Sequence, residues 1–594
     1  MHIIKTLMKS IREYKKQSIL TPIFIVFEVI LECTIPFIVA LFINTLQDFS
    51  SVNANPGELM KKIIIYGIIL VIMAFASLGC GIMAAKCASK ASAGFAKNLR
   101  HDLYYKIQDY SFSNIDKFST PSLVTRMTTD VENVRHAYMM IIRIAIRSPL
   151  LLIFSMSIAF SYHSTLPLIF LVVLPILGGG LYLIFMKAHP LFRRVFKKYD
   201  TLNNTIQENV RGMRVVKAYV RENHEIDKFE NASSDVERDF TKAEKIMNMN
   251  NPLMVFSMYV CMTLISFFGA KIIISTGASD LNIGDLTSLT TYTMQMLSSL
   301  MMFSMVFLMV VISTESATRI VEVLDENPTI VNPSNPIYEV KNGDIVFKDV
   351  SFKYARSAQK YALSDIDLEI KSGETIGILG GTGSSKSTLI QLISRLYDCT
   401  EGEVSVGGVN VKDYDLTTLR SQVAVVLQKN VLFSGTIKEN LRWGNKEASD
   451  EEIIEACKLA QAHEFVSQFT DGYDTYIEQG GTNVSGGQKQ RLCIARALLK
   501  KPKVLILDDS TSAVDTKTDA LIRKGLKDYI PETTKIIIAQ RVASIKDADK
   551  IIVMENGTIS AIGTHKELLK SNAIYKEVYY SQSTKKVKES ENNG

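Results

Sequence analysis

A chain of 594 residues is too long for one ordinary domain, so at least two domains are expected. Hydrophobic residues make up 47% of the chain and its mean hydropathy is +0.12, values that argue against a wholly soluble protein. The formal net charge of +6 is small for this length and gives no reason to expect a nucleic-acid partner. Seven dispersed cysteines without a C-x-x-C spacing fit neither a disulfide framework nor a zinc site.

The first half of the chain contains long apolar runs. Each run reaches the roughly 20 residues needed to cross a ~30 Å hydrocarbon core, which predicts a transmembrane domain over residues 1–325. The first run is too long for a signal peptide and has no small-residue cleavage site, so we expect it to be retained. The six predicted spans lie roughly at 18–45, 61–86, 138–161, 165–188, 251–276 and 286–313.

Basic residues predict the orientation of these spans. A cluster of lysine and arginine before the first run places the N-terminus in the cytoplasm, and six spans return the chain to that side. The polar, helix-like segments 87–137 and 189–250 then extend into the cytoplasm. We therefore expect a multi-pass protein of the cell membrane, surrounded by lipid, with its second half cytoplasmic. The basic residues are Lys5, Lys9, Arg12, Lys15 and Lys16, whereas Lys61 and Lys62 blur the pattern in the first outer loop.

Two features of the spans are candidates for contact with a substrate. Glu28 and Glu32 lie four apart on one helical face, and ionisable residues at membrane depth are costly and usually face a cavity or a partner. They could contact a cationic or polar substrate; the alternatives are pairing with Arg143 or Arg147, or a position at the wet end of a cavity. The methionines of the last run suit either a promiscuous apolar cavity or ordinary helix packing. These are Met294, Met296, Met301, Met302, Met305 and Met309.

The second half of the chain reads as a soluble α/β domain. A turn-rich stretch at 327–336 with three prolines predicts a linker over 326–340. We expect the soluble domain over 341–580 and a polar, disordered tail over 581–594.

A glycine-rich stretch in this domain nearly matches a phosphate-binding loop. It follows a strand-like segment at 375–379 and precedes an apolar-faced helix at 389–397, which is the context that G-x-x-x-x-G-K-[ST] requires. Backbone N–H groups would cradle phosphates, Lys386 would approach the β- and γ-phosphates, and Ser387 would ligate Mg²⁺. Ser385 replaces the motif's glycine but keeps the backbone N–H. The candidate ATP-binding residues are Gly380, Gly381, Thr382, Gly383, Ser384, Ser385, Lys386, Ser387 and Thr388.

Two further segments favour a nucleotide site over a chance Gly/Ser-rich turn. Residues 503–509 form an apolar strand that ends in two carboxylates and would deliver Asp508 to the Mg²⁺ region. Residues 483–491 form a short glycine turn before a helix, which is a second anion site at a helix N-terminus.

These motifs, in this order, resemble those of ATP-binding cassette (ABC) transporters. The VSGGQ sequence at 484–488 looks like the family's signature motif, and six spans before the cassette resemble an ABC exporter half-transporter over nearly the whole chain. The resemblance implies a membrane α-helical bundle with long cytoplasmic extensions, followed by an α/β P-loop NTPase domain. It implies an ATPase-coupled transporter that uses ATP and Mg²⁺. Segments 114–118 with 126–130, and 208–217, look like its two intracellular loops with coupling helices.

The resemblance also assigns roles to single residues. Tyr354 looks like the aromatic residue that stacks on adenine, and Gln428 like the Q-loop glutamine that contacts Mg²⁺ and faces the membrane domain. Asp508 matches the Walker B aspartate, so the implied Mg²⁺ ligands are Ser387, Gln428 and Asp508. The signature and the D-loop at 512–515 would face a partner's nucleotide. The residues implied there are Ser485, Gly486, Gly487, Gln488 and Asp515.

Three positions depart from the family pattern. Besides Ser385, Asp509 stands where hydrolytic members have the general-base glutamate, and its carboxylate should fall about 1 Å short of the attacking water. Gln540 stands where the family has the switch histidine, and an amide cannot titrate near neutral pH. All three belong to the parts that serve this chain's own nucleotide.

In this family two cassettes sandwich two ATP molecules, and each site combines the Walker motifs of one with the signature of the other. The intact signature beside a degenerate site of its own implies an asymmetric heterodimer with a homologous half-transporter. The architecture suggests multidrug-type export, with small hydrophobic or amphipathic compounds as substrates. Alternatives are a homodimer with two slow sites and a non-transporting, ATP-binding sensor subunit; an importer subunit fits poorly because importers usually keep the two domains on separate chains.

Overall fold

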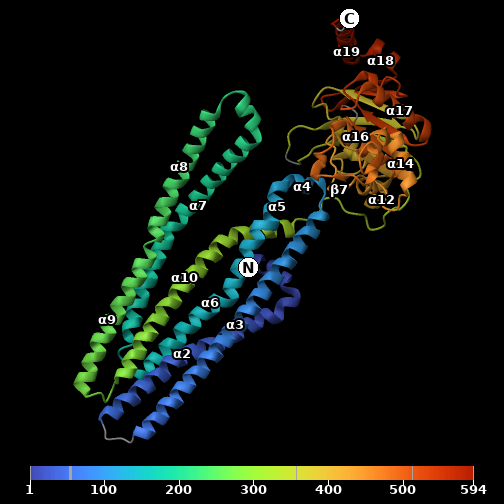
Figure 1. Cartoon of the computed structure of the whole chain (residues 1–594). Coiled ribbons are helices and arrows are strands. Elements are labelled where there is room, and N and C mark those ends of the chain that lie inside the picture. The colour runs from blue at the N-terminus through green and yellow to red at the C-terminus, as the bar shows by residue number, and fades with distance from the viewer. Residues whose placement is uncertain (1, 52–55, 356–357, 511–512, 593–594) are drawn as a thin grey trace. The chain divides into compact units, whose positions relative to one another are not determined.

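The chain folds into two compact units, each described here by itself. The computed structural model describes residues 2–51, 56–355, 358–510 and 513–592. Unit 1 comprises residues 1–108 and 120–326, and unit 2 comprises residues 109–119 and 327–594 (Figure 1). The short segment 109–119 therefore packs with the second unit, although it lies inside the span 1–325 predicted as the transmembrane domain.

Unit 1 consists of long helices. Six of them, among the described residues, are long and apolar enough to cross a membrane, which confirms the predicted number of spans. Helices of 32 to 53 residues exceed the roughly 20 needed for a bilayer, so several of them continue well beyond it. Their bounds are α1 His2–Met8, η1 Lys9–Tyr14, α2 Lys15–Ser51, α3 Pro56–Gln108, α5 Thr120–Thr125, η2 Arg126–Asp130, α6 Val131–Tyr162, α7 Leu168–Ala218, α8 Glu222–Met247, α9 Asn250–Thr276 and α10 Ile283–Asp325.

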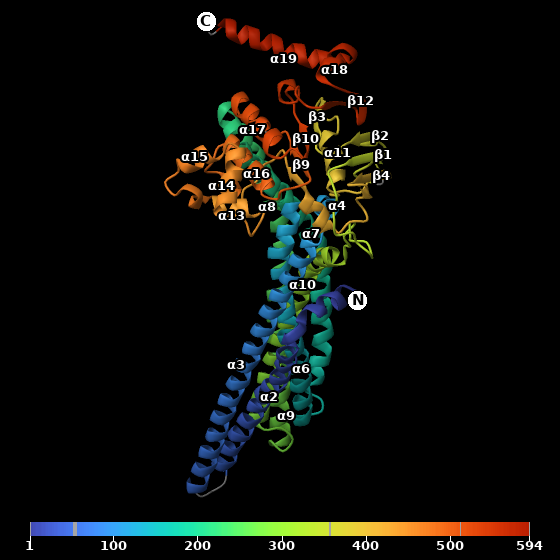
Figure 2. The ribbon, with the colours of Figure 1, turned by 90° about the vertical axis from the view of Figure 1, so that its right-hand side faces the viewer.

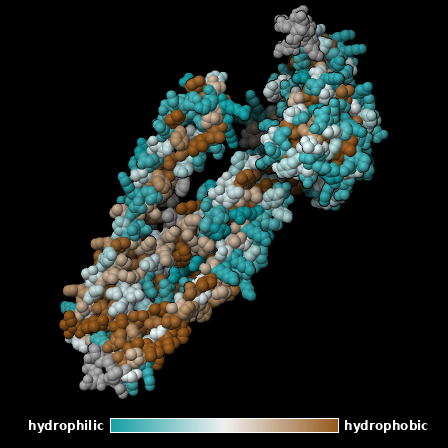
Figure 3. All heavy atoms as spheres, viewed as in Figure 1, coloured by the Kyte–Doolittle hydropathy of each residue, from teal (hydrophilic) through white to brown (hydrophobic). Residues whose placement is uncertain are grey.

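Small residues let these helices approach closely. The face of α3 that is buried against its neighbours carries Ala84, Ala88 and Ala91. Three consecutive glycines lie in α7 at 178–180, and at the last of them, Gly180, an added Cβ would meet Leu253 at 2.7 Å, so this glycine is needed for packing against α9. Apolar side chains gather around the end where α9 joins α10, and hydrophilic side chains gather around the turn between α7 and α8 (Figure 3). This division fits an apolar membrane part and a polar helical extension.

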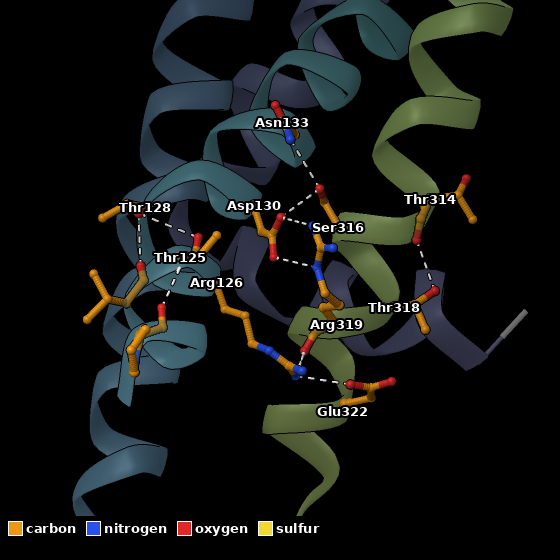
Figure 4. Close-up of polar contacts among 12 residues, drawn as sticks. Thr125, Arg126, Thr128, Asp130, Asn133, Thr314, Ser316, Thr318, Arg319 and Glu322 are labelled. Carbon is orange, nitrogen blue, oxygen red and sulfur yellow. Dashed lines mark hydrogen bonds and ion pairs between the residues drawn. The ribbon is translucent and has the colours of Figure 1, made fainter. Parts of the chain in front are cut away.

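A polar cluster joins η2 to α10 in unit 1 (Figure 4). Asp130 is fully buried and accepts hydrogen bonds from Arg319 and from the hydroxyl of Ser316 at 2.8 Å. Asn133 donates to the same Ser316 hydroxyl at 3.1 Å. The guanidinium of Arg126 donates to the carbonyl of Arg319 and lies 3.0 Å from Glu322. The five residues Arg126–Asp130 are π-helical, a local widening that often marks a functional position in a helix.

Unit 2 is built on two larger sheets, and β7 and β8 form a separate two-stranded sheet. A six-stranded sheet has the order β12-β11-β3-β10-β9-β6, parallel except for β12, and a four-stranded antiparallel sheet has the order β2-β1-β4-β5. Every residue of β9 and β10 is buried, as expected for parallel strands covered on both faces. In such a sheet ligands bind beyond the carboxyl ends of the central strands. Here these ends belong to β3, β9 and β10.

The remaining elements surround these sheets. The helices α13–α16 and the strands β1, β2 and β4 lie on opposite sides of the unit (Figure 2). The bounds are α4 Phe112–Phe118, β1 Ile345–Phe352, β2 Leu363–Ile370, β3 Thr375–Gly380, α11 Lys386–Ile393, β4 Glu401–Val406, β5 Val409–Asn410, α12 Leu416–Gln422, β6 Val423–Val426, β7 Gly435–Thr436, α13 Ile437–Arg442, α14 Asp450–Leu459, α15 His463–Ser467, η3 Gly472–Asp474, β8 Tyr476–Ile477, η4 Gln479–Gly481, α16 Gly486–Leu498, β9 Val504–Asp508, α17 Thr516–Tyr529, β10 Thr534–Ile538, η5 Val542–Ser544, β11 Lys550–Glu555, β12 Thr558–Gly563, α18 His565–Ser571 and α19 Ala573–Asn592.

The last helix of the chain reaches into the segment 581–594, for which the sequence predicts disorder. The structure gives α19 the bounds Ala573–Asn592, and the disorder of this tail stays a prediction. Gln582 gives a physical reason for order at that point, because its side-chain amide makes two hydrogen bonds to the backbone after β10. Residues 593 and 594 lie outside the described residues.

Candidate nucleotide site

The predicted phosphate loop connects β3 to α11. Strand β3 ends at Gly380 and α11 begins at Lys386, so the predicted strand–turn–helix order is present and the helix starts three residues earlier than expected. The ammonium group of Lys386 donates hydrogen bonds to the carbonyls of Gly380 at 2.9 Å and Gly381 at 2.8 Å, and to the hydroxyl of Ser384 at 3.2 Å. An added Cβ at Gly380 would meet the Met554 carbonyl oxygen at 2.4 Å, so glycine is required there. The loop thus curves around its own lysine.

Ser385 adopts a left-handed backbone conformation. Its φ is 68° and its ψ is 26°, and its carbonyl accepts from the backbone N–H of Leu389 at 3.1 Å to begin α11. This region is disfavoured for residues with a Cβ by about 1–2 kcal/mol, which explains why the motif has glycine here. The replacement therefore leaves the loop's path intact at the expense of local strain.

Two carboxylates stand at the carboxyl ends of the neighbouring strands. Asp508 is the last residue of β9, and Asp509 follows it with a backbone N–H that donates to Ile538 of β10 at 3.0 Å. Burial raises the pKa of Asp508, with the charge of Asp509 acting in the same direction and a hydrogen bond from Ser387 opposing it. Burial lowers the pKa of Lys386, an effect that Asp508 and Asp509 oppose. The cation and both acids therefore share one poorly solvated space.

The positions of the predicted base and switch residue are in direct contact. The side-chain amide of Gln540 donates to Asp509 Oδ2 at 2.8 Å. Burial raises the pKa of Asp509, and hydrogen bonds from Gln428 and Gln540 partly offset this rise. The structure therefore brings together Gln428, Asp508, Asp509 and Gln540 beside the loop, and their roles toward a nucleotide stay predictions.

The signature segment forms a second, separate helix N-terminus. Ser485 caps α16: its hydroxyl accepts from the backbone N–H of Gln488 at 3.3 Å, and the Gln488 side chain accepts from the Ser485 N–H at 2.8 Å. An added Cβ at Gly487 would lie 2.8 Å from the Ala513 carbonyl oxygen, so the glycine lets the D-loop pack against the signature. Asp515 caps α17 through its carboxylate. Ser512, the first residue of the predicted D-loop, lies outside the described residues.

Tyr354 lies beside the phosphate loop. Its hydroxyl is 2.8 Å from the hydroxyl of Thr388, and its ring packs edge-on against Phe352 and Tyr397. About half of the side chain, 51% by exposed area, is open to solvent. A ring fixed at its edges with an open face fits the predicted stacking on a base.

Sequence reasoning missed the contacts that α4 makes with the segment between α11 and β4. The hydroxyl of Tyr397 donates to Asp116 Oδ2 at 2.6 Å, and the rings of Phe112 and Tyr397 lie 6.1 Å apart. Asn114 donates to the carbonyl of Asn327 at 3.0 Å, which ties α4 to the start of the linker. The sequence places segment 114–118 in a predicted intracellular loop, and its role as a coupling helix stays a prediction. No pattern pointed to Tyr397, which reads only as the end of an apolar helix.

The candidate substrate residues of unit 1 meet a basic partner. Arg147 of α6 lies 2.6 Å from Glu32 and 3.7 Å from Glu28, both on α2. This is the pairing with Arg147 that the sequence offers as an alternative to substrate contact. A role for Glu28 and Glu32 in substrate binding stays a prediction.

The residues at the loop fit ATP with Mg²⁺. Ser387, Gln428 and Asp508 supply the hydroxyl, carbonyl and carboxylate oxygens that Mg²⁺ prefers, and the first and last of these are hydrogen-bonded to each other. An added Cβ at Gly380 would also meet the hydroxyl of Ser384 at 2.5 Å, so the loop has no room for a side chain at that position. When bound, Mg²⁺ would neutralise charge on the β- and γ-phosphates.

Comparisons with known proteins agree with this arrangement. The model for "ABC transporter transmembrane region" matches residues 19–300, and the model for "ABC transporter" matches residues 363–512. The ABC transporter ATP-binding protein YknU of Bacillus subtilis is 38% identical over 482 residues, covering 81% of this chain and 82% of the relative. YfiB of the same organism is 36% identical, covering 88% and 90%.

Two further proteins bear on the fold and the family. A Staphylococcus aureus protein named for multidrug export as an ATP-binding/permease protein is 32% identical, covering 82% of this chain and 84% of its own. The solved structure of a bacterial Atm1-family ABC exporter with ATP bound has a TM-score of 0.81 at 21% identity, covering 95% of this chain and 98% of its own. That likeness shows the fold.

Proposed function

The chain belongs to the ABC transporter family and has the exporter fold, and on that premise we propose that it is the degenerate-site half of an asymmetric heterodimeric exporter. Its own nucleotide site binds ATP with Mg²⁺ but hydrolyses it slowly. Its signature completes the active site of a homologous half-transporter, where most hydrolysis takes place.

The contact between Asp509 and Gln540 carries this proposal. A general base must reach the attacking water, and Asp509 is one methylene shorter than the glutamate of hydrolytic relatives. Its carboxylate is instead held by the amide of Gln540 at 2.8 Å and by Gln428. An amide cannot take up a proton from this pair as an imidazole could. The side chain at the base position is therefore too short to reach the water and is already hydrogen-bonded to two glutamines, which supports slow hydrolysis.

The binding parts of the same site are retained. Lys386 sits in the loop at the N-terminus of α11, where backbone N–H groups and the helix dipole favour phosphate. Asp508 and Ser387 are hydrogen-bonded to each other at the Mg²⁺ position. Loss of the hydrolytic groups beside preserved binding groups supports a site whose role is to hold ATP.

The signature shows no corresponding decay. Ser485 and Gln488 form a complete capping box at the start of α16, and Gly487 allows the close approach of residue 513. These groups point to a nucleotide bound by another chain in this family's arrangement. A sensor without transport would have no need for them.

An apolar cavity in unit 1 supports export of hydrophobic or amphipathic compounds. It has a volume of about 680 Å³, within the range of small-molecule sites, and is lined mainly by α7 and α10, with Met247 and Asn250 where α8 meets α9. Three of the six methionines noted in the sequence line it, whereas Met296 is buried in the helix core. Flexible methionines among aromatic rings suit a range of apolar ligands. Its lining includes Tyr182, Phe185, Met301, Met302, Met305 and Phe307.

The proposal includes a place in the cell. The basic residues near the N-terminus support a multi-pass protein of the cell membrane whose N-terminus and cassette lie in the cytoplasm. ATP is then available to the cassette, and substrates enter the cavity from the cytoplasm or the inner leaflet.

The test compares this chain alone with this chain co-purified with a homologous half-transporter of the same organism, sought first among the products of neighbouring genes. We expect the pair to hydrolyse ATP at a rate typical of exporters, with the chain alone binding ATP and Mg²⁺ but releasing little phosphate. A partner with glutamate and histidine at the positions of Asp509 and Gln540 is expected. Brisk hydrolysis by this chain alone would contradict the asymmetric proposal and favour a homodimer. ATP binding with no transport by the pair would favour a sensor.

A further inference from the structure

The last helix of the chain is anchored firmly to unit 2. Tyr575 of α19 is fully buried, and its hydroxyl is hydrogen-bonded to the ring of His565 at 2.7 Å. The N–H of Tyr575 donates to the side chain of Asn572 at 2.8 Å, which caps the start of the helix. Ile574 and Val578 pack against the same hydrophobic core. The first two turns of α19 therefore have a fixed position on the cassette.

Gln582 extends this anchoring to the loop that follows β10. Its side-chain N–H donates to the carbonyl of Gln540 at 2.8 Å, and its carbonyl oxygen accepts from the N–H of Val542 at 2.9 Å. One planar amide thus holds two backbone groups two residues apart. Such a pair of bonds fixes the orientation of the loop as well as its distance from α19.

The loop held in this way is an exposed bridge between two fixed points. Ala539 is still attached to the sheet through its N–H, which donates to Ile378 of β3 at 3.3 Å. Val542 is buried at the start of η5. Between them, Gln540 and Arg541 are exposed, so packing alone does not fix their backbone. Gln582 spans these two residues.

We propose that Gln582 is a positioning residue for this chain's own nucleotide site: by holding the backbone at 540–542 it keeps the side chain of Gln540 against Asp509. The inference rests on the proposed function in that the site binds ATP. It assigns to the C-terminal helix a role in nucleotide binding.

The position of Gln540 determines whether ATP or ADP should lose more binding affinity when Gln582 is replaced. Asp509 and Gln540 follow the carboxyl ends of β9 and β10, on the side of the site where Lys386 approaches the β- and γ-phosphates. ADP lacks the γ-phosphate. Loosening the 540–542 loop should therefore weaken ATP binding more than ADP binding.

The experiment uses the full-length chain in lipid nanodiscs, with MANT-ATP and MANT-ADP as probes in the presence of Mg²⁺. Gln582→Ala removes both hydrogen bonds, and we expect an affinity for MANT-ATP about fivefold lower, with MANT-ADP changed less than twofold. Gln582→Glu keeps an acceptor for Val542 but cannot donate to Gln540, so an intermediate loss is expected. Ser581→Ala is the matched control, because the one hydrogen bond of that hydroxyl among the described residues goes to the carbonyl of Val578 within α19.

Hydrogen exchange of the nucleotide-free chain tests the contact itself. In Gln582→Ala the segment 540–545 should exchange faster, while the buried strands β9 and β10 keep the protection of the unaltered chain. Equal MANT-ATP affinity in Gln582→Ala and the control, or unchanged exchange at 540–545, would overturn the inference. Faster exchange throughout the cassette would also overturn it, because that result indicates a general packing role. Failure of the unaltered chain to bind MANT-ATP would remove the proposed function, and the inference with it.

Discussion

Arg319 of α10 places its guanidinium against both carboxylate oxygens of Asp130, with Nε at 2.9 Å from Oδ2 and a terminal nitrogen at 2.5 Å from Oδ1. The side chain of Asp130 is 1% exposed and that of Arg319 is 40% exposed. Bidentate pairs of this kind are among the strongest ionic hydrogen bonds. The pair connects the end of η2, ten residues after the chain returns to unit 1 at Thr120, to the last turns of α10.

Removing Arg319 should destabilise unit 1. Arg319→Met leaves a buried carboxylate without its cation, which should cost about 1–3 kcal/mol and lower the thermal midpoint of the purified chain. Asp130→Asn keeps an acceptor for Ser316 and should cost less. Arg238→Met, which breaks the exposed pair with Asp235 on α8, is the control and should change stability by less than about 0.5 kcal/mol. Equal midpoints for Arg319→Met and Arg238→Met would show that the pair contributes nothing.

Restoring the motif glycine at position 385 should stabilise the cassette. Ser385 is held at φ 68°, and a left-handed residue with a Cβ carries about 1–2 kcal/mol of strain, of which glycine's greater freedom in the unfolded chain cancels part. We expect Ser385→Gly to raise stability by about 0.5–1 kcal/mol, measured by thermal unfolding without nucleotide. Gly383→Ala, at φ +83°, is the opposite change and should lower stability. A lower midpoint for Ser385→Gly would mean that the serine side chain supplies a contact that outweighs the strain.

Replacing Asp509 and Gln540 together by the glutamate and histidine of hydrolytic relatives should restore hydrolysis at this chain's own site. Asp509→Glu with Gln540→His supplies the longer carboxylate and an imidazole, so phosphate release from this chain's own site should rise by about 10- to 100-fold. Each single change should give less, because the two side chains contact each other at 2.8 Å. Phosphate release is best measured in the heterodimer with the partner's own base removed. No gain in the double variant would mean that other groups limit hydrolysis at this site.

Much of the fold and of the nucleotide site could be predicted from the sequence, because both leave local patterns: apolar runs of fixed length and motifs between a strand and a helix. Long apolar runs predict the spans, and a strand–loop–helix pattern places Lys386 and Asp508 at one edge of a sheet. What remained hidden depends on contacts between distant residues. Whether Glu28 faces a substrate or Arg147 depends on the rotation of α2 against α6. The hydrogen bond from Tyr397 to Asp116 joins residues 281 apart in the chain. Gln582, which is hydrogen-bonded to the 540–542 loop, lies in a segment whose composition suggests disorder.

The signature and the phosphate loop should fail in different ways. Ser485→Ala removes the cap of α16 and, on the proposed function, should abolish most hydrolysis by the heterodimer while this chain still binds ATP. Lys386→Ala should do the reverse, with loss of ATP binding at this chain's own site and partial retention of hydrolysis at the partner's. Nucleotide binding at the two sites is distinguished by photo-crosslinking of 8-azido-ATP to each subunit. Equal loss of hydrolysis in both variants would argue for two equivalent sites.

Glu28 and Glu32 in the first span should contribute to stability only while Arg147 is present to pair with them. If their role is pairing, Arg147→Met leaves two carboxylates close together at membrane depth, and we expect a loss of about 1–3 kcal/mol in stability, the pair being partly exposed. Glu28→Gln with Glu32→Gln should also destabilise, because a cation is left without a partner. The triple change removes all three charges and should restore most of the stability. Pairing would be contradicted if the double glutamine variant kept full stability and selectively lost export of a cationic dye such as ethidium, since that outcome assigns the carboxylates to the substrate.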